Sequence, residues 1–211
     1  WQTVLVKDLQ NPSQLPEKTV ALTFDDGFAD NYKSAFLPLL EHKMKATWFI
    51  TTDCIDNYAH WMGPKTEEIK MLSTQQLREM ATQGMEIAAH TCSHPDLTTL
   101  PYPNQLEELK KSKETLESIL SDKISSFAYP YGRYNQDSIK AAEQVGYTQA
   151  CSVRSGFYRN TESPFLIRRV TIFDTDTVST LARKLVFADN DVSWNRLSRY
   201  YWQRLKNKLH F

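Results

Sequence analysis

Hydrophobic and polar positions along the chain follow two alternating patterns, short apolar or β-branched runs and longer segments with apolar residues at helical spacing. The apolar runs are typical of buried strands. We predict strands at 19–24, 45–51, 85–89, 124–129, 147–153 and 165–173. The amphipathic segments predict helices at 30–42, 73–84, 104–121, 135–145 and 177–187. This alternation of strand and helix predicts a mostly parallel sheet, either open or closed into a barrel.

Local signals mark where some of these helices begin and end. Ser73 and Gln76 form a capping-box pattern at the start of the second predicted helix, and Gly84 follows its last turn. The helix at 104–121 carries leucines at helical spacing among many Lys and Glu residues, which predicts a buried stripe and a solvated face. Pro38 predicts a kink or an uneven start in the first helix.

Composition restricts the class of protein. The chain has 211 residues, 41% of them hydrophobic and 24% charged, which fits one sizeable globular domain. Its formal net charge of zero argues against a general nucleic-acid binder. No apolar run reaches the roughly 18–20 residues that span a bilayer. The chain begins at Trp1, and we expect it to be an excised or processed piece. Its three widely spaced cysteines predict mostly buried thiols, with at most one disulfide.

The first predicted strand ends on two adjacent carboxylates, Asp25 and Asp26, followed by Gly27. If both acids were ionised and close together they would repel each other, so we expect something to compensate. A divalent cation would do so, with one acid as its ligand and the other free to accept a proton. The alternative is a solvated Asp-Gly turn that carries no chemistry.

His90 and His94 follow the third predicted strand, four residues apart. One turn of helix-like backbone can aim both imidazoles at one point, and a nearby carboxylate would complete a catalytic zinc site with an open coordination position. Sites in parallel α/β proteins gather at the carboxyl ends of strands, where Asp25 and Asp26 also lie. Cys92 lies between the histidines, and we expect it to face away from them.

Three motifs, in this order, resemble those of the polysaccharide deacetylase family (carbohydrate esterase family four). The family's Thr-Phe-Asp-Asp motif is present at Thr23–Asp26, and its His-(Ser/Thr)-x-x-His motif is present at His90–His94. The third motif, Arg-x-Pro-Tyr-Gly, is present in part at Ala128–Gly132. The segments Glu86–His90 and Phe127–Gly132 are nearest the branch that deacetylates bacterial poly-N-acetylglucosamine.

This resemblance implies a fold and a set of roles. The fold would be α/β, an irregular (β/α)7 barrel in a single domain. Asp26, His90 and His94 would hold the metal, which is expected to be Zn²⁺, with Co²⁺ or Ni²⁺ as alternatives. Asp25 would be the general base, and the backbone N–H of Tyr131 would contact the oxyanion of the tetrahedral intermediate.

The chain departs from the family pattern in two places. Ala128 stands where the third motif has an arginine that orients the base, and we predict that Arg169, from another strand, takes over that role. The family's late histidine, its usual general acid, is not visible, because His210 at the terminus is the only histidine after His94. Either Asp25 returns its proton, or another group donates one, or turnover is slow.

Aromatic residues in loops are candidates for stacking on sugar rings. Tyr131, the adjacent Pro130 and Trp61 are predicted to contact the substrate, and Tyr58 lies in a loop that could do so. Trp48, in the second predicted strand, is predicted to belong to the core.

We predict three parts of the chain: a lead-in at 1–18, the catalytic domain at 19–190, and a basic, aromatic helix or tail at 191–211. After Asp191 the tail carries Arg, Lys, Trp and Tyr residues and no acid, so one interpretation is contact with a membrane surface or another polyanion. The alternative is a terminal amphipathic helix that packs its aromatic residues on the body. We expect a monomer.

The leading functional prediction is a metal-dependent N-deacetylase that acts on a β-linked N-acetylglucosamine polysaccharide outside the cytoplasm, in the periplasm, secreted or at the cell surface. An O-acetyl esterase on xylan or another acetylated glycan, or a deacetylase of a smaller glycoconjugate, would share the same motifs. A glycan-binding module with little turnover is the alternative from another class. The missing late histidine and the missing third-motif arginine favour the module, whereas Asp25 disfavours it because a pure binder needs no base.

Overall fold

The structure is a computed structural model that describes residues 1–63, 69–159, 161–193, 198 and 202. The chain divides into two compact units. The first comprises Trp1–Ser152 and Asn160–Ile167, and the second comprises Val153–Arg159 and Arg168–Phe211. Most of the predicted tail at 191–211 lies outside the described residues, so its contact with a membrane stays a prediction. The predicted boundaries at 18 and 190 also stay predictions.

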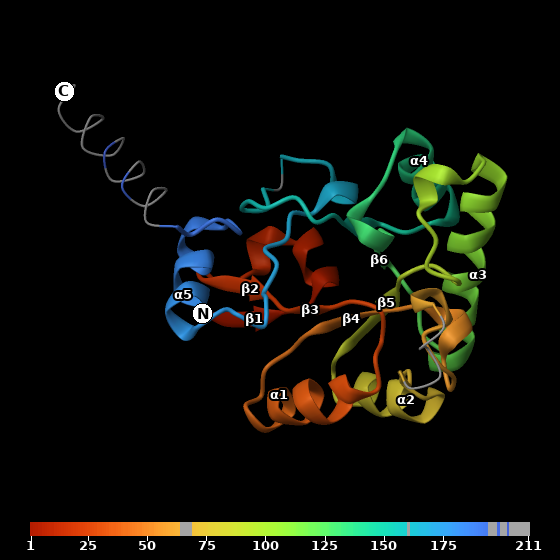
Figure 1. The fold of residues 1–211 in the computed structure, drawn as a ribbon, viewed down its shortest axis with the longest axis horizontal. Coiled ribbons are helices and arrows are strands. Elements are labelled where there is room, and N and C mark those ends of the chain that lie inside the picture. The colour runs from red at the N-terminus through yellow and green to blue at the C-terminus, as the bar shows by residue number, and fades with distance from the viewer. Residues whose placement is uncertain (64–68, 160, 194–197, 199–201, 203–211) are drawn as a thin grey trace. The chain divides into compact units, whose positions relative to one another are not determined.

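The first unit is built on a five-stranded parallel sheet whose strand order is β3-β4-β5-β6-β7 (Figure 1). Its strands are β3 Thr23–Phe24, β4 Thr47–Ile50, β5 Glu86–Ala89, β6 Ser126–Ala128 and β7 Gln149–Cys151. A separate two-stranded parallel sheet joins β1 Gln2–Val4 to β2 Thr19–Ala21. Spatial order follows chain order in the larger sheet, as the alternation of strand and helix predicts.

Helices connect the parallel strands. The α-helices of the first unit are α1 Leu37–Glu41, α2 Thr74–Thr82, α3 Tyr102–Leu120 and α4 Gln136–Val145. Short 3-10 helices lie at Val6–Gln10, Pro12–Gln14, Thr52–Cys54, His60–Met62, Leu97–Thr99, Pro130–Gly132 and Pro164–Leu166. In Figure 1, α3 lies along α4, and both α2 and α3 pack against β5. These elements confirm the predicted α/β class.

The helix predicted at 30–42 has the uneven start that Pro38 indicated. It begins as a π-helical turn, Tyr32–Phe36, before α1 continues it. The Leu37 N–H donates to the carbonyl of Tyr32, five residues back, and Pro38 has no N–H to donate. The capping box at Ser73 is confirmed, because its hydroxyl accepts from the Gln76 N–H at 3.2 Å.

Two strand predictions need correction. The run at 19–24 is divided at Leu22, because β2 pairs with β1 whereas β3 pairs with β4 in the larger sheet. No strand lies at 165–173. Ser163 caps the 3-10 helix Pro164–Leu166, and Ile167 alone forms a parallel bridge, with Cys151. The pattern of apolar residues cannot show a change of pairing partner, since it is continuous from Val20 to Phe24.

The core lies between the sheet and its helices. Every residue of β4 is buried, as expected for a parallel strand that is covered on both faces. Trp48 is 0% exposed and stacks on Phe24 with ring centroids 4.8 Å apart, which confirms its predicted place in the core. Cys54, Cys92 and Cys151 are buried free thiols, as predicted.

The start of β5 carries a buried carboxylate, Glu86, which is 5% exposed. Its oxygens accept hydrogen bonds from the Thr47 hydroxyl at 2.7 Å, the Ser126 hydroxyl at 2.6 Å and the backbone N–H of Lys7 at 3.0 Å. These contacts connect β4, β5 and β6 and attach the predicted lead-in to the sheet. Three hydrogen bonds to its carboxylate offset the free energy that burial of Glu86 costs.

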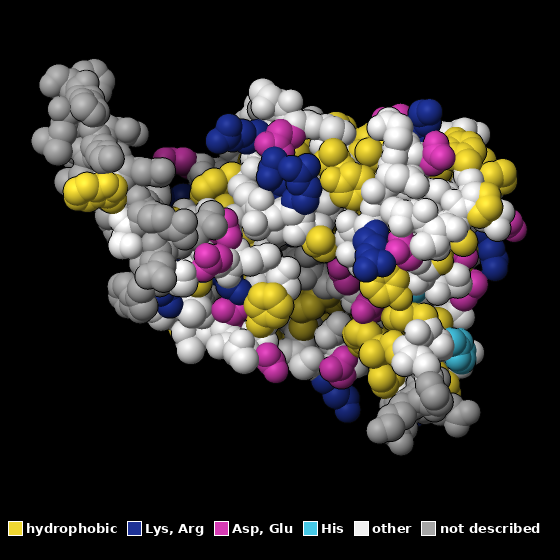
Figure 2. Space-filling view, turned by 45° about the horizontal axis from the view of Figure 1, so that its top comes forward, with side chains coloured by type: hydrophobic (Ala, Val, Ile, Leu, Met, Phe, Trp, Pro, Cys, Tyr) yellow, Lys and Arg dark blue, Asp and Glu magenta, His cyan; other side chains and the backbone are white. Residues whose placement is uncertain are grey.

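The second unit contains α5 Val178–Phe187, which confirms the helix predicted at 177–187. Its Lys184 ammonium is 2% exposed and lies 2.5 Å from the Asp176 carboxylate. Among the helices of the described residues, none combines the length and the apolar character that a bilayer crossing needs. On the face drawn in Figure 2, basic and acidic side chains are intermixed.

Candidate metal centre

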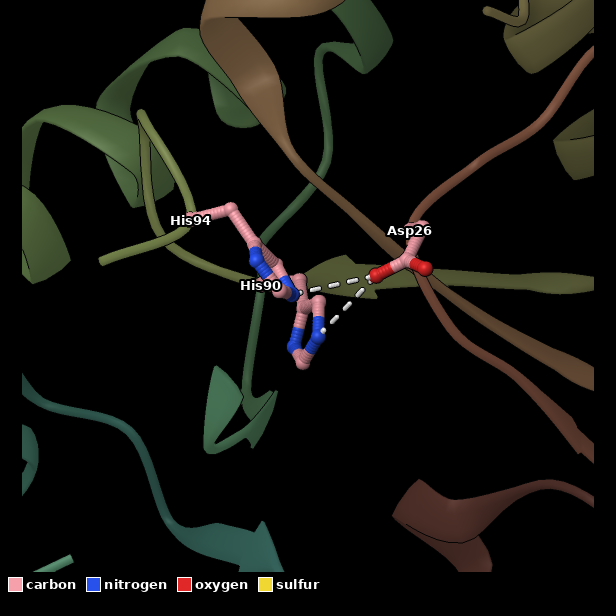
Figure 3. Close-up of side chains that lie close together, drawn as sticks. All are labelled: Asp26, His90 and His94. Carbon is pink, nitrogen blue, oxygen red and sulfur yellow. Dashed lines mark ion pairs between the residues drawn. The ribbon is translucent and has the colours of Figure 1, made fainter. Parts of the chain in front are cut away.

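Three side chains from separate segments converge at the carboxyl end of the sheet. Asp26 follows β3, His90 follows β5, and His94 lies four residues further on (Figure 3). One ligand atom from each residue lies within 4.8 Å of the other two. The Nε2 atoms of His90 and His94 lie 3.5 and 3.2 Å from the same oxygen, Oδ1 of Asp26. The structure thus brings together the three residues predicted as metal ligands.

The turn after β3 presents the Asp26 carboxylate. Asp26 and Gly27 both have positive φ, 73° and 91°. The Asp26 carbonyl accepts from the Thr51 N–H at 3.2 Å, and a Cβ on Gly27 would approach Ile50 Cδ1 to 3.0 Å. Glycine is therefore required where the turn passes close to the end of β4, and this turn aims Asp26 at the histidines.

His90 has a defined tautomer. Its Nδ1 lies 2.8 Å from the carbonyl oxygen of Ala128, which can only accept, so Nδ1 carries the hydrogen. In the neutral ring, Nε2 then directs a lone pair toward the Asp26 carboxylate. Two acceptors face each other there, and either a proton or a metal cation must lie between them. Orientation of a ligating histidine by a backbone carbonyl is typical of metal sites.

His94 is held between two aromatic side chains. The Trp61 ring stacks on it with centroids 4.8 Å apart and an interplanar angle of 28°, and the Tyr131 ring meets it at 4.6 Å and 71°. The His94 backbone N–H donates to the Thr91 hydroxyl at 3.1 Å, and its buried Nδ1 has no hydrogen-bond partner among the described residues. Packing, more than hydrogen bonding, fixes this ring.

The donor set fits a divalent cation. Two imidazole nitrogens and one carboxylate oxygen form the ligand set of catalytic zinc sites, and cobalt or nickel also accept it. Burial alone would raise the pKa of the Asp26 carboxyl, but contacts with His90 and His94 bring the pKa well below its ordinary value. Asp26 is thus a carboxylate ready to ligate.

Cys92 is not part of this donor set. Its thiol donates to the backbone carbonyl of Glu108 at 3.3 Å, so it faces α3 and, as predicted, is not aimed at the point where the histidines meet. Burial raises the pKa of the Cys92 thiol to about 12, which keeps it protonated and makes it a poor ligand.

The other predicted site residues have different surroundings. Asp25 follows β3 directly and is partly buried. Tyr131 has φ 57° and a 55% exposed side chain, and its backbone N–H has no acceptor among the described residues. Pro130 is buried, and its predicted contact with the substrate stays a prediction. Arg169 belongs to the second unit, where its N–H donates to the Arg154 carbonyl at 3.0 Å, and its role toward Asp25 stays a prediction.

Two contributors were not found from the sequence. The Ala128 carbonyl orients His90, but a backbone atom leaves no trace in residue type. Glu108 lies on the face of α3 predicted to be solvated, yet its carboxylate binds the loop between the two histidines. A Glu among many Glu and Lys residues carries no signal that separates it from them.

Comparison with known proteins shows the family of this chain. The sequence model of the family described as polysaccharide deacetylase matches residues 13–150. The chain is 31% identical over 176 residues to the Bacillus subtilis protein YxkH, which bears the name of a polysaccharide deacetylase; the match covers 82% of this chain and 59% of that protein. It is also 26% identical over 173 residues to the poly-β-1,6-N-acetyl-D-glucosamine N-deacetylase of Staphylococcus aureus. That match covers 76% of this chain and 57% of the relative.

A solved structure has the same fold. The Streptococcus pyogenes deacetylase PplD, in complex with acetate, superposes with a TM-score of 0.75 and 27% identity, over 87% of this chain and 80% of that chain. This likeness confirms the predicted irregular (β/α)7 barrel. The chain spans less than two thirds of the length of both curated relatives. From the match over residues 13–150 and the similarity to YxkH, this chain belongs to the polysaccharide deacetylase family.

Proposed function

We propose that this protein is a metal-dependent hydrolase that removes N-acetyl groups from a β-linked N-acetylglucosamine polysaccharide, with Zn²⁺ as the metal. The observation that carries the proposal is the convergence of Asp26, His90 and His94, with ligand atoms within 4.8 Å of one another. The named substrate of the Staphylococcus aureus relative supports the choice of glycan.

Asp25 acts as the general base in this proposal. A neutral amide is a weak electrophile and water a weak nucleophile, so hydrolysis needs both to be activated. A divalent cation held by Asp26, His90 and His94 supplies the Lewis acidity for this. The position of Asp25, immediately before Asp26 and directly after β3, supports its assignment as the group that takes the proton of the attacking water. The same group returns the proton to the departing amine.

Tyr131 supplies a second contact to the oxyanion. Its ring centroid lies 4.6 Å from that of His94, so the residue lies beside the candidate metal centre. Its left-handed backbone, at φ 57°, leaves the N–H without a protein acceptor among the described residues. A preorganised N–H of this kind stabilises negative charge that develops on the acetyl oxygen.

Aromatic rings beside the centre support a sugar substrate. The half-exposed Tyr131 ring offers a stacking surface, and Pro130 shapes the backbone next to it. Trp61 stacks on His94 and on Phe28, with ring centroids 4.8 and 6.2 Å away, and is partly buried, so only the exposed part of its indole is left for substrate. We therefore assign substrate contact to Tyr131 and Trp61.

We further propose that the protein acts outside the cytoplasm as a monomer. A polysaccharide of the kind named for the Staphylococcus aureus relative is too large to reach an enzyme enclosed in the cytoplasm after export. The basic and aromatic residues after Asp191 would bring the enzyme to a membrane surface.

Acetate release tests the proposal. Poly-β-1,6-N-acetylglucosamine, chitooligosaccharide and acetylated xylan are each incubated with the protein, with and without a chelator, and with Asp25→Asn as the inactive control. We expect release from poly-β-1,6-N-acetylglucosamine that chelation abolishes. Release from acetylated xylan alone would show an O-acetyl esterase. Glycan binding with no acetate released, even with added zinc, would show a binding module.

A further inference from the structure

The loop between His90 and His94 has an unfavourable backbone. Thr91 has φ 66° and His94 has φ 60°, in the left-handed region where a β-branched residue such as threonine is an outlier. Each such residue costs conformational free energy and persists only where the surroundings hold it. The loop must therefore be fixed by contacts from outside, and the direction of both imidazoles depends on them.

One of these contacts is the side chain of Glu108, from α3. Its Oε2 accepts the backbone N–H groups of Cys92 at 2.8 Å and Ser93 at 3.0 Å, and its Oε1 accepts the Ser93 hydroxyl at 2.7 Å. Two successive N–H groups beside left-handed residues form a concave site that favours an anion. Hydrogen bonds to a carboxylate are stronger than those between neutral groups.

Backbone hydrogen bonds also hold the loop. The N–H groups of Thr52 and Asp53, in the 3-10 helix Thr52–Cys54, donate to the carbonyls of Thr91 and Cys92 at 3.1 and 3.0 Å. These bonds persist whatever side chains are present. By contrast, the contacts on the loop that depend on residue identity include the Glu108 carboxylate and the Thr91 hydroxyl that accepts the His94 N–H at 3.1 Å. Of these two, only Glu108 comes from another element of the fold.

We propose that Glu108 is a positioning residue of the metal centre: its carboxylate fixes the loop at 91–93 and so aims His90 and His94 at Asp26. This inference rests on the metal site of the proposed function. Removing the carboxylate leaves the Cys92 N–H without an acceptor in a residue only 2% exposed, so the loop must rearrange to satisfy it. Rearrangement changes the geometry offered to the metal without touching a ligand.

Cobalt binding tests this role, because Co²⁺ absorbs visible light in a way that reports its coordination geometry. The metal-free parent, Glu108→Ala, Glu108→Gln and Glu107→Ala are titrated with Co²⁺, and circular dichroism checks that each is folded. We expect Glu108→Ala to bind Co²⁺ about 10–100-fold more weakly than the parent, the range found when a partner that orients metal ligands is removed. The absorption spectrum of its bound Co²⁺ should also differ from that of the parent.

The other two variants distinguish loss of the loop contacts of Glu108 from a general effect of removing a negative charge or a side chain from α3. Glu107 is the exposed neighbour on the same helix, so Glu107→Ala removes the same charge and should bind cobalt like the parent. In Glu108→Gln the amide oxygen can accept the Cys92 and Ser93 N–H groups while its NH₂ donates to the Ser93 hydroxyl. We expect it to restore most of the affinity and the parent spectrum.

Parent affinity and an unchanged spectrum in Glu108→Ala would overturn the inference. If that variant does not fold, Glu108→Asp decides: its carboxylate is one methylene shorter, and binding equal to that of the parent would also overturn it, whereas weaker binding than in Glu108→Gln supports it. If the parent itself takes up no cobalt, the metal centre fails and the Glu108 assignment with it. If the parent binds and Glu108→Ala binds equally well, only the Glu108 assignment fails.

Discussion

His90 and Asp26 face each other with acceptor atoms. Nε2 of His90 lies 3.5 Å from Oδ1 of Asp26, while its Nδ1 hydrogen is used by the Ala128 carbonyl at 2.8 Å. Such a contact between a lone pair and a carboxylate is stable when a cation or a proton lies between them. The relationship makes this end of the barrel a site for a ligand and not only a polar part of the core.

Asp25→Asn should abolish acetate release and leave the metal bound. The variant removes the carboxylate that accepts the proton, and a general base contributes about 10²–10⁴-fold to the rate. The three ligand residues are unchanged. Acetate release and zinc content are measured on the same preparation. If Asp25→Asn lost zinc as well as activity, Asp25 would be a metal ligand and not the base. If the variant kept full activity, Asp25 would have no role in the mechanism.

Arg169→Ala should lose most of the activity and keep its metal. Ala128 occupies the place of the arginine in the family's third motif, and we predict that Arg169 orients the base instead. We expect kcat to fall about tenfold or more, because a base that is no longer held in the right direction takes the proton less efficiently. Arg169→Lys keeps the positive charge but loses the planar guanidinium, which can bind a carboxylate with two hydrogen bonds. It should therefore recover only part of the lost activity. Full activity in Arg169→Ala would exclude this role.

Glu86→Ala should destabilise the barrel. It leaves the Thr47 and Ser126 hydroxyls and the Lys7 N–H without their shared acceptor, and opens a cavity at the start of β5. Loss of buried hydrogen bonds together with a cavity costs about 2–5 kcal/mol of unfolding free energy. Urea unfolding followed by circular dichroism measures it. Glu107→Ala, on the exposed face of α3, is the matched control and should change the unfolding free energy little.

Glu117 should make a contribution to stability that depends on pH. Burial alone would raise the pKa of its carboxyl, but the hydrogen bond from the Ile124 N–H at 3.1 Å and Lys113 at 3.0 Å hold the pKa below its usual value of 4.5. A carboxyl whose pKa is lowered by folding stabilises the protein above its unfolded-state pKa. That contribution is lost as pH falls through the folded-state pKa.

Comparison of the parent with Glu117→Gln tests this sign. The variant should be less stable than the parent at about pH 7, and the difference should shrink toward zero as the pH is lowered to about 3. Urea unfolding at several pH values measures the difference. A gap that widened on acidification would show that Glu117 is stabilised in its protonated form.

The elements and the convergence of ligands were predictable because both follow from local rules. Helices such as α2 and α4 carry caps and an apolar stripe that the sequence shows directly. Asp26 and His90 follow strands of one parallel sheet, so the topology alone places them at the same edge. The residue types at that edge then indicated the chemistry.

What could not be predicted depends on partners distant in the chain. The break at Leu22 arises because β2 and β3 join different sheets. Glu108 resembles any exposed residue of α3 until the loop at 91–93 is placed against it. The hydrogen of His90 is fixed by the Ala128 backbone, an atom common to every residue type. Each is a tertiary contact with no periodic signal of its own.

Metal uptake by the purified protein tests the central claim most directly. The metal-free chain is titrated with Zn²⁺, with bound zinc measured after removal of the free ion, beside Asp26→Ala, His90→Ala and His94→Ala as variants that each remove one ligand. We expect the parent to hold one zinc ion per chain and each variant to bind it at least about tenfold more weakly. A parent that takes up no zinc, or variants that bind it as tightly as the parent does, would contradict the metal centre.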